Sequence, residues 1–250
     1  MNQKSLNANT LKFIAILAMT LDHILWVVFP GYLLNPLIVL GHAIGRITAP
    51  IMCFFIAEGY YQTHNLKKYI FRLFAFALVS HFAYNFAFGI PFIPFQTKVF
   101  NQTSVMWALA WGLVVLTIVQ SNHPKLTRTV KTALVWLICG ISFCADWSCI
   151  AVLIIMVFGI HRGDFKNQMN GMLFYVAMYS AVYFFFIDKV YGLLQMTVAL
   201  SIPFLMHYNG KRGEWKGMKW FFYLYYPLHL AILGVVRILI HGNVSMMIGG

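Results

Sequence analysis

Lys12 and His23, two residues able to take part in chemistry, lie eleven positions apart in the first apolar run of the chain. Eleven residues of α-helix turn through about 1100°, three turns plus about 20°, so both side chains project from one face. The rise between them is about 16 Å. If this run crosses a membrane, the face carries a cation at one mouth and an imidazole near mid-bilayer. As a hypothesis, a long ligand with an anionic head and a reactive tail, such as a phosphopantetheine thioester, fits this line.

Both residues also have simpler explanations. Lys12 could be an anchor that snorkels its charge to the lipid headgroups, and His23 could only bridge two helices by a hydrogen bond. The neighbouring Asp22 weakens the simple explanation of His23, because adjacent residues point about 100° apart on a helix and need separate partners. Arg46 is the candidate partner of Asp22, since a charge at that depth costs about 2.5–3.5 kcal/mol. We expect a structural Asp22–Arg46 pair that leaves His23 available for chemistry.

Several other polar residues lie at membrane depth, and some of them are supporting candidates beside Arg46. His42 shares a helix face with Arg46 through its i,i+4 spacing. We expect Glu58 to form a structural ion pair with a basic residue of the third apolar run (67–88) or the ninth (218–241), and we favour this over a catalytic role. Further candidates are a polar cluster in the third run and two residues in the last run: His81, Tyr84, Asn85, Tyr226 and His229.

Basic residues next to the apolar runs are candidates for binding phosphate. Lys68 and Arg72 share one face of the third run. The segment 208–213 is a turn that contains Asn209, Lys211, Arg212 and two glycines. Glycines let backbone N–H groups approach a phosphate and the cations neutralise it, although the spacing is not that of a Walker motif. A basic loop is also what membrane topology requires, so this pattern alone is weak.

The elements that hold these residues must lie in a bilayer. Of the 250 residues, 61% are hydrophobic and only 10% are charged, whereas soluble domains carry about 25% charged residues. A single helical bundle uses the whole chain, so we expect one domain over 1–250. The net charge of +12 comes without a basic arm or an aromatic-basic module, which argues against nucleic acid. The four cysteines match no zinc or redox spacing, and we expect no metal site.

Apolar runs predict an all-α, polytopic transmembrane bundle of about nine spans, with eight to ten possible. The predicted spans are 11–30, 36–62, 67–88, 104–120, 127–144, 147–161, 170–187, 190–208 and 218–241. The fifth and sixth could instead form one broken hairpin around Asp146. With nine alternating spans, fourteen of the eighteen basic residues fall on one side, while Lys98 and Lys189 fall on the other. This bias places the N-terminus in the cytoplasm.

Several segments together resemble the TraX family. They are Leu11-Lys12 through Asp22-His23, Gly45-Arg46 through Glu58-Gly59, Lys68 through Leu73, Asn209 through Gly213, and Phe222 through Leu230. The matches follow family order over nearly the whole chain. TraX proteins are associated with N-terminal acetylation of conjugative pilin, and relatives accompany pilus genes. A wider resemblance is to transmembrane acyltransferases, in which a basic residue precedes a histidine on the first span at this spacing. This chain has Lys12 at the position where those proteins more usually have Arg. Lys68 and Arg72 match a later basic pair of that group only loosely.

The resemblance implies an acetyltransferase of the bacterial inner membrane that uses acetyl-CoA as co-substrate. Its cofactor-binding residues would be Lys12, Lys68, Arg72, Asn209, Lys211 and Arg212. His23 would be a general base or a transient acetyl carrier, with Asp22 acting only indirectly. The expected acceptor is the N-terminal amine of a pilin at the outer face. The alternatives are O-acetylation of an envelope saccharide, and a non-enzymatic pilus-assembly or transport protein. The sequence leaves the acyl chain length and the oligomeric state open.

Overall fold

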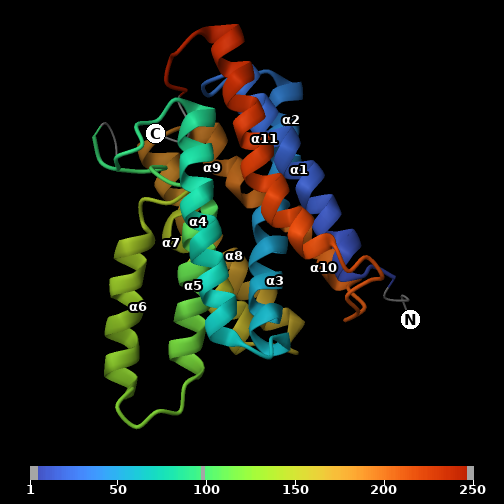
Figure 1. The fold of residues 1–250 in the computed structure, drawn as a ribbon, viewed down its shortest axis with the longest axis vertical. Coiled ribbons are helices and arrows are strands. Elements are labelled where there is room, and N and C mark those ends of the chain that lie inside the picture. Colours follow the sequence, from blue (N-terminus) through green and yellow to red (C-terminus); the bar gives the residue numbers. More distant parts are fainter. Residues whose placement is uncertain (1–4, 97–98, 247–250) are drawn as a thin grey trace. The chain divides into compact units, whose positions relative to one another are not determined.

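The computed structural model describes residues 5–96 and 99–246, and these residues are helical apart from loops and two isolated β-bridges. In chain order the helices shown in Figure 1 are α1 (Ala8–Val28), α2 (Pro36–Gly45), α3 (Thr48–Gln62), α4 (Leu66–Phe88), α5 (Val105–Gln120), α6 (Arg128–Ser142), α7 (Ser148–Ile160), α8 (Phe165–Phe186), α9 (Lys189–Gln195), the 3-10 helix η1 (Met196–Ser201), α10 (Ile202–Met206) and α11 (Met218–His241). Each predicted span coincides with helix, which confirms the all-α class. Lys4 and Lys98, used in the charge count, lie outside the described residues.

Six helical segments are long and apolar enough to cross a membrane. They are 8–28, 36–62, 66–88, 165–186, 189–206 and 220–241. α5 and α7 are apolar but have only 16 and 13 residues, and α6 has 15. Large apolar side chains stand exposed on the long segments, for example Leu37 at 78% and Phe186 at 82%, and such surfaces suit lipid. The chain is a multi-pass membrane protein, and crossing by the three shorter helices stays a prediction.

Prolines explain why two of the expected spans are interrupted. The run 36–62 is divided into α2 and α3 around Arg46 and Ile47. Pro50 lies in the first turn of α3, and a proline ring clashes with the carbonyl four residues earlier, here that of Arg46. Pro203 in α10 likewise disfavours regular helix at Ala199, which lies in η1. The first break places Arg46 at a helix end, where its side chain can turn toward α1.

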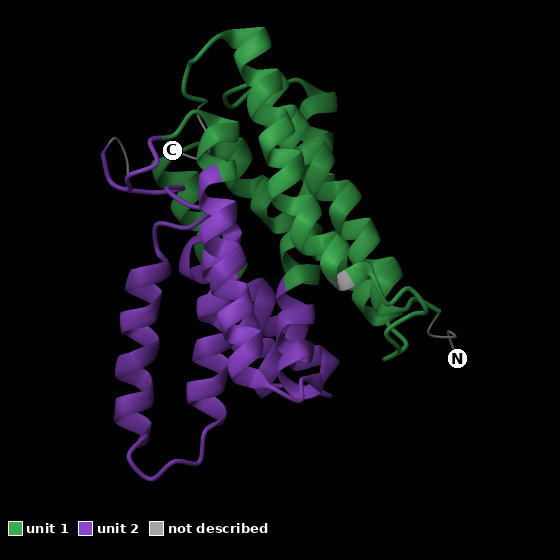
Figure 2. Ribbon diagram, in the orientation of Figure 1, with its two compact units in different colours: residues 1–52, 83–90, 176–250 green, residues 53–82, 91–175 purple. Residues whose placement is uncertain are grey.

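The described residues divide into two compact units (Figure 2). Unit 1 comprises residues 1–52, 83–90 and 176–250, and unit 2 comprises 53–82 and 91–175. Neither unit is a continuous stretch of chain, because α3, α4 and α8 each contribute to both. The expected single domain over 1–250 stays a prediction.

Unit 1 is built around α1, which packs against α2 and α11 (Figure 1). Close packing with α2 depends on glycine: a Cβ at Gly41 would lie 2.3 Å from Leu25, and one at Gly45 would lie 2.5 Å from Asp22. Leu11 and Ala15 on the packed side of α1 are fully buried, whereas Leu17 is 57% exposed. The buried stripe of α1 is therefore the side that also carries the candidate site.

Unit 2 contains α5, α6 and α7, with α5 and α7 in the closest contact. Gly112 of α5 faces Ile155, and Gly159 of α7 faces Leu116, at distances that leave no room for a Cβ. Cys53 donates a hydrogen bond to the Ala151 carbonyl at 3.7 Å. The glycines thus let α5 and α7 pack closely, and the cysteine contact ties α3 to α7.

Candidate active site

A histidine pair joins α1 to α11 inside unit 1. His23 and His229 are 8% and 6% exposed, and His23 Nδ1 lies 2.9 Å from His229 Nε2. The rings of Phe88 and Tyr226 lie at 80° and 67° to the ring of His23, with centroids 5.8 and 6.4 Å away. The surroundings of the pair are thus mostly aromatic, and an imidazole held this way is both dry and fixed in orientation. Pairing of His23 with His229 is a contact that the sequence analysis did not anticipate.

A second polar contact between the same two helices lies one turn away. The hydroxyls of Thr20 and Tyr225 are 2.8 Å apart, and Thr20 also donates to the Ile16 carbonyl at 2.8 Å. Because a carbonyl can only accept, Thr20 uses its proton there and accepts from the Tyr225 hydroxyl. Tyr225 and His229 share a face of α11, with ring planes 13° apart. Two polar contacts one turn apart therefore fix the register of α1 against α11.

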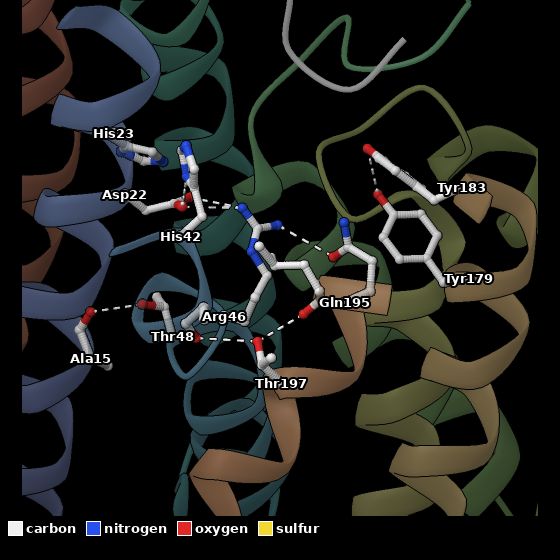
Figure 3. Close-up of polar contacts among 12 residues, drawn as sticks. Ala15, Asp22, His23, His42, Arg46, Thr48, Tyr179, Tyr183, Gln195 and Thr197 are labelled. Carbon is white, nitrogen blue, oxygen red and sulfur yellow. Dashed lines mark hydrogen bonds and ion pairs between the residues drawn. The ribbon is translucent and has the colours of Figure 1, made fainter. Parts of the chain in front are cut away.

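Asp22 is bound by residues of α2 and its C-terminal end, and Figure 3 shows its carboxylate beside His42 and Arg46. Nη2 of Arg46 donates to both carboxylate oxygens at 3.1 Å, and His42 Nδ1 lies 2.8 Å from Oδ1. Arg46 Nη1 reaches Gln195 Oε1 at 3.4 Å. The predicted Asp22–Arg46 pair is confirmed. Adjacent residues of α1 serve different neighbours, so Asp22 contributes to the site by holding α2 against α1.

The cytoplasmic end predicted for α1 is capped by the loop 207–217. Ala8 and Asn9 donate their backbone N–H groups to the carbonyls of Lys211 and Arg212 at 2.9 and 3.1 Å. Asn7 caps the helix by accepting from the Thr10 N–H at 3.0 Å. The first backbone donors of α1, which in other helices are open to anions, are thus occupied. These N–H groups of α1 are therefore not available to hold a phosphate.

The glycines of this loop have conformational and packing explanations. Gly210 and Gly213 have φ of +76° and +91°, a region that L-residues with a Cβ rarely adopt. A Cβ on Gly213 would also lie 2.7 Å from Asn7 Oδ1. The side chain of Asn209 accepts from the Lys211 N–H at 2.9 Å, which tightens the turn. The loop is therefore shaped to dock on α1.

Three cations gather where this loop meets α1. Lys12 is half-buried and close enough to Arg212 for their charges to repel, while Lys211 and Arg212 are exposed. The structure thus brings Lys12 together with the loop residues predicted to accompany it. A concentration of positive charge at one end of α1, with an imidazole further along the same helix face, suits a ligand that has an anionic end.

Other candidates of unit 1 pack around the histidines. Tyr84 and Asn85, on the last turns of α4, are 1% and 0% exposed. The Tyr84 ring lies 4.9 Å from that of Phe88, which in turn contacts His23. Tyr226 lies against both histidine rings. Tyr226, together with Tyr84 through its contact with Phe88, forms the aromatic wall of the site.

The remaining candidates belong to unit 2. Glu58 binds Arg162 through two hydrogen bonds of 2.8 and 3.2 Å. The expectation of a structural pair holds, but the partner predicted in the third or ninth run is wrong: Arg162 follows α7. His81 donates to the Phe92 carbonyl at 2.7 Å. Lys68 is exposed, and Arg72 lies over the Tyr69 ring at 5.3 Å.

Three contributors to the site were not among the predicted site residues. His42 is fully buried against Asp22, and its i,i+4 spacing from Arg46 was the signal for it. Thr20 and Tyr225 lie one turn before His23 and His229 on their respective helices, but neither residue type distinguishes itself in an apolar run. The contact between them depends on the register of two helices far apart in sequence.

Comparison with known proteins places this site in a family context. The family model described as "TraX protein" matches residues 7–237. The chain is also 28% identical over 236 residues to a protein of Dichelobacter nodosus described as "Probable fimbrial assembly protein FimC, serogroup H1". That alignment covers 91% of this chain and 94% of the relative. No solved structure matches.

Proposed function

Since the chain belongs to the TraX family, we propose that it is a membrane-embedded acetyltransferase. It moves an acetyl group from acetyl-CoA on the cytoplasmic side to an acceptor at the outer face, with the N-terminal amine of a pilin favoured. The membrane is the bacterial inner membrane, which is where cytoplasmic acetyl-CoA and an acceptor outside the cell can be reached by one protein.

The observation that carries this proposal is the environment of His23. Its Nδ1 is bonded to His229, whereas its Nε2 makes no hydrogen bond within the described residues. An imidazole nitrogen that carries no hydrogen bond keeps its lone pair available to take a proton or to attack a carbonyl carbon. General bases and nucleophilic imidazoles both need such a free nitrogen.

The basic end of α1 supports acetyl-CoA as the co-substrate. Lys12 and Arg212 lie near each other, and the rise from Lys12 to His23 is about 16 Å. This length is comparable to the arm that separates phosphates from thioester in coenzyme A. Lys12, Lys211 and Arg212 would neutralise the phosphates by side-chain contacts, because the first N–H groups of α1 are already bound to loop carbonyls. Asn209 would support this binding by tightening the loop that carries Lys211 and Arg212. Lys68 and Arg72 belong to unit 2, and a role for them in binding phosphate stays a prediction.

Acetyl-CoA would supply the acetyl group as a thioester. For an amine acceptor, the N–C bond forms as the C–S bond breaks. His23 Nε2 takes the proton that the amine loses and passes it to the departing sulfur, so the free thiol is the second product. An acetyl group carried transiently on His23 Nε2 would need the same free nitrogen. Asp22 takes no part in the proton transfer, since its carboxylate is bound to Arg46 and His42.

The pilin acceptor is supported by the relative described as a probable fimbrial assembly protein. A pilin that has been processed has a free amine at its N-terminus, which is a nucleophile for the thioester in its unprotonated form. A hydroxyl of an envelope saccharide is the second acceptor within the same chemistry, and the test below includes both.

The test is transfer of labelled acetyl from acetyl-CoA by purified protein in detergent, with a pilin N-terminal peptide or an envelope saccharide as acceptor, read by mass spectrometry. We expect His23→Ala to lower the transfer rate by about 10²–10⁴-fold. His123→Ala is the matched control, because His123 is exposed in the loop after α5. Wild-type turnover by His23→Ala would disprove the assignment.

A non-enzymatic assembly protein is the alternative, and two observations favour it. The relative's description concerns assembly, and both Asp22 and Glu58 sit in ion pairs that stabilise helices without doing chemistry. On this alternative, the wild-type protein neither binds acetyl-CoA nor transfers acetyl, yet His23→Ala still impairs piliation. Binding of acetyl-CoA that competes with free coenzyme A would exclude it.

A further inference from the structure

The two imidazoles of the His23–His229 pair meet edge to edge. Their planes differ by 2°, their centroids are 5.2 Å apart, and the bonded nitrogens are 2.9 Å apart. These values are compatible only with rings that lie nearly in one plane, with Nδ1 of His23 pointing at Nε2 of His229. In-plane approach is the geometry that a ring N–H and a ring lone pair require.

The second nitrogen of His229 fixes the direction of this bond. His229 Nδ1 lies 3.0 Å from the backbone carbonyl of Tyr225. A carbonyl only accepts, so Nδ1 carries the proton, and Nε2 of a neutral His229 is a bare acceptor. His23 Nδ1 must then be the donor. A neutral imidazole has one N–H, and His23 Nε2 is left as the lone-pair nitrogen.

We propose that His229 is a positioning residue that holds His23 in the Nδ1–H tautomer and thereby makes Nε2 the reactive nitrogen. The inference rests on the proposed function only in taking His23 as the catalytic group. It goes beyond that function by naming which nitrogen reacts and which residue determines it. His229 acts through His23 and has no contact with substrate in this role.

The chain of contacts is anchored at both ends. Tyr225 supplies the carbonyl that orients His229, and its own hydroxyl is bound to Thr20 on α1, one turn before His23. Rotation or sliding of α11 against α1 would break both contacts together. The Tyr225 carbonyl orients His229, and His229 in turn orients His23. His229 thereby does for His23 what the carboxylate does in a Ser-His-Asp triad, namely fix tautomer and orientation. A neutral imidazole does so in an apolar environment without burying a further charge.

The tautomer can be measured without turnover. In protein labelled with ¹⁵N at its nine histidines, the His23 signals are identified by their loss in His23→Gln. We expect the wild type to show His23 protonated at Nδ1 only.

His229→Phe keeps a ring beside Tyr225 but offers no acceptor for the Nδ1–H of His23, so His23 should no longer be confined to this single tautomer. His229→Gln places an amide oxygen near the former Nε2 and should retain it. His241→Phe is the matched control, because His241 also joins α11 to α1 by a hydrogen bond, to the Val27 carbonyl at 3.0 Å.

Steady-state kinetics supply the second measurement. His229→Phe should lower kcat by about 10²–10⁴-fold and change KM for acetyl-CoA by less than about threefold, since it removes orientation and not binding. His229→Gln should recover kcat to within about tenfold of the wild type, and His241→Phe should leave it unchanged. Gln also covers the case in which the Phe variant does not fold.

A wild-type His23 protonated at Nε2, or a His229→Phe protein that keeps both tautomer and kcat, would overturn the inference. Absence of acetyl transfer by the wild type would count against the proposed function alone. The tautomer of His23 in the wild type and in the two His229 variants would still decide this inference, because it is read without substrate.

Discussion

Arg46 holds both carboxylate oxygens of Asp22 with a single nitrogen, Nη2, at 3.1 Å. The side chains of the pair are only 11% and 13% exposed, and His42 adds a third contact to the same carboxylate. These contacts join α1 to α2 at the point where the predicted span 36–62 is interrupted. Removing either partner leaves a largely buried charge without its ionic partner.

We expect Asp22→Ala to destabilise the protein by about 3–5 kcal/mol, because breaking a buried ion pair strands the second charge. The free energy of unfolding is measured in detergent by titration with denaturant. Asp22→Ala combined with Arg46→Met should be less destabilised than Asp22→Ala alone. Glu58→Ala is the comparison, since its partner Arg162 is 43% exposed and such pairs contribute about 0.2–1 kcal/mol. Equal losses for Asp22→Ala and Glu58→Ala would contradict this ranking.

Gly45 is the residue that lets α2 come this close to α1. A Cβ at this position would lie 2.5 Å from the Asp22 Cβ, so Gly45→Ala must push the helices apart. We expect a loss of about 1–3 kcal/mol, as for other overpacked contacts. Gly140→Ala in α6 is the control of opposite sign: nothing lies within 4 Å of its added Cβ, and the better helix propensity should stabilise by up to about 1 kcal/mol. Loss of stability in both variants would show that packing at Gly45 is not the cause.

Arg237 ties the segment after α11 to the rest of unit 1. The residue is 2% exposed, and its guanidinium donates to the carbonyls of Val244 and Phe86. Arg237→Met keeps the apolar stem and removes all of these donors. We expect faster amide hydrogen exchange in residues 242–246, including the Met246 N–H that bonds to the Phe88 carbonyl at 2.8 Å, because the opening free energy falls. Unchanged protection there, with α5 as an internal reference, would rule out this anchoring role.

The helices and one ion pair could be predicted from the sequence, for physical reasons. A helix that crosses lipid needs a long apolar run, and such runs are visible without knowing how they pack. Asp22 and Arg46 could be paired because both lie at depth, in neighbouring runs, where leaving a charge alone is costly. The break near Arg46 was also readable from Pro50, although the run was predicted as one span.

The histidine pair could not be derived in the same way. His23 and His229 are 206 residues apart, and whether two helices bring particular residues together depends on their register and rotation. Tyr225 and Thr20 look like ordinary members of apolar helices until that register is known. Glu58 shows the same difficulty: several basic residues could satisfy it, and the fold selected Arg162 from outside the runs considered.

The charge on Lys12 offers a test of ligand binding that misfolding cannot imitate. Lys12 lies close enough to Arg212 for repulsion, so Lys12→Met, which keeps the apolar stem, relieves a repulsion between like charges. We expect it to change the thermal midpoint by no more than about 2–4 °C, equivalent to about 1 kcal/mol. In contrast, KM for acetyl-CoA should rise by about 10–100-fold, the loss of one charge-assisted contact to phosphate, with kcat little changed.

Lys12→Arg should behave like the wild type, since it keeps the charge and can bind phosphate by two donors. Lys125→Met, which removes an exposed charge from the loop after α5, should alter neither quantity. A Lys12→Met protein with unchanged KM would leave this residue only the role of a membrane anchor, and acetyl-CoA would have to enter elsewhere.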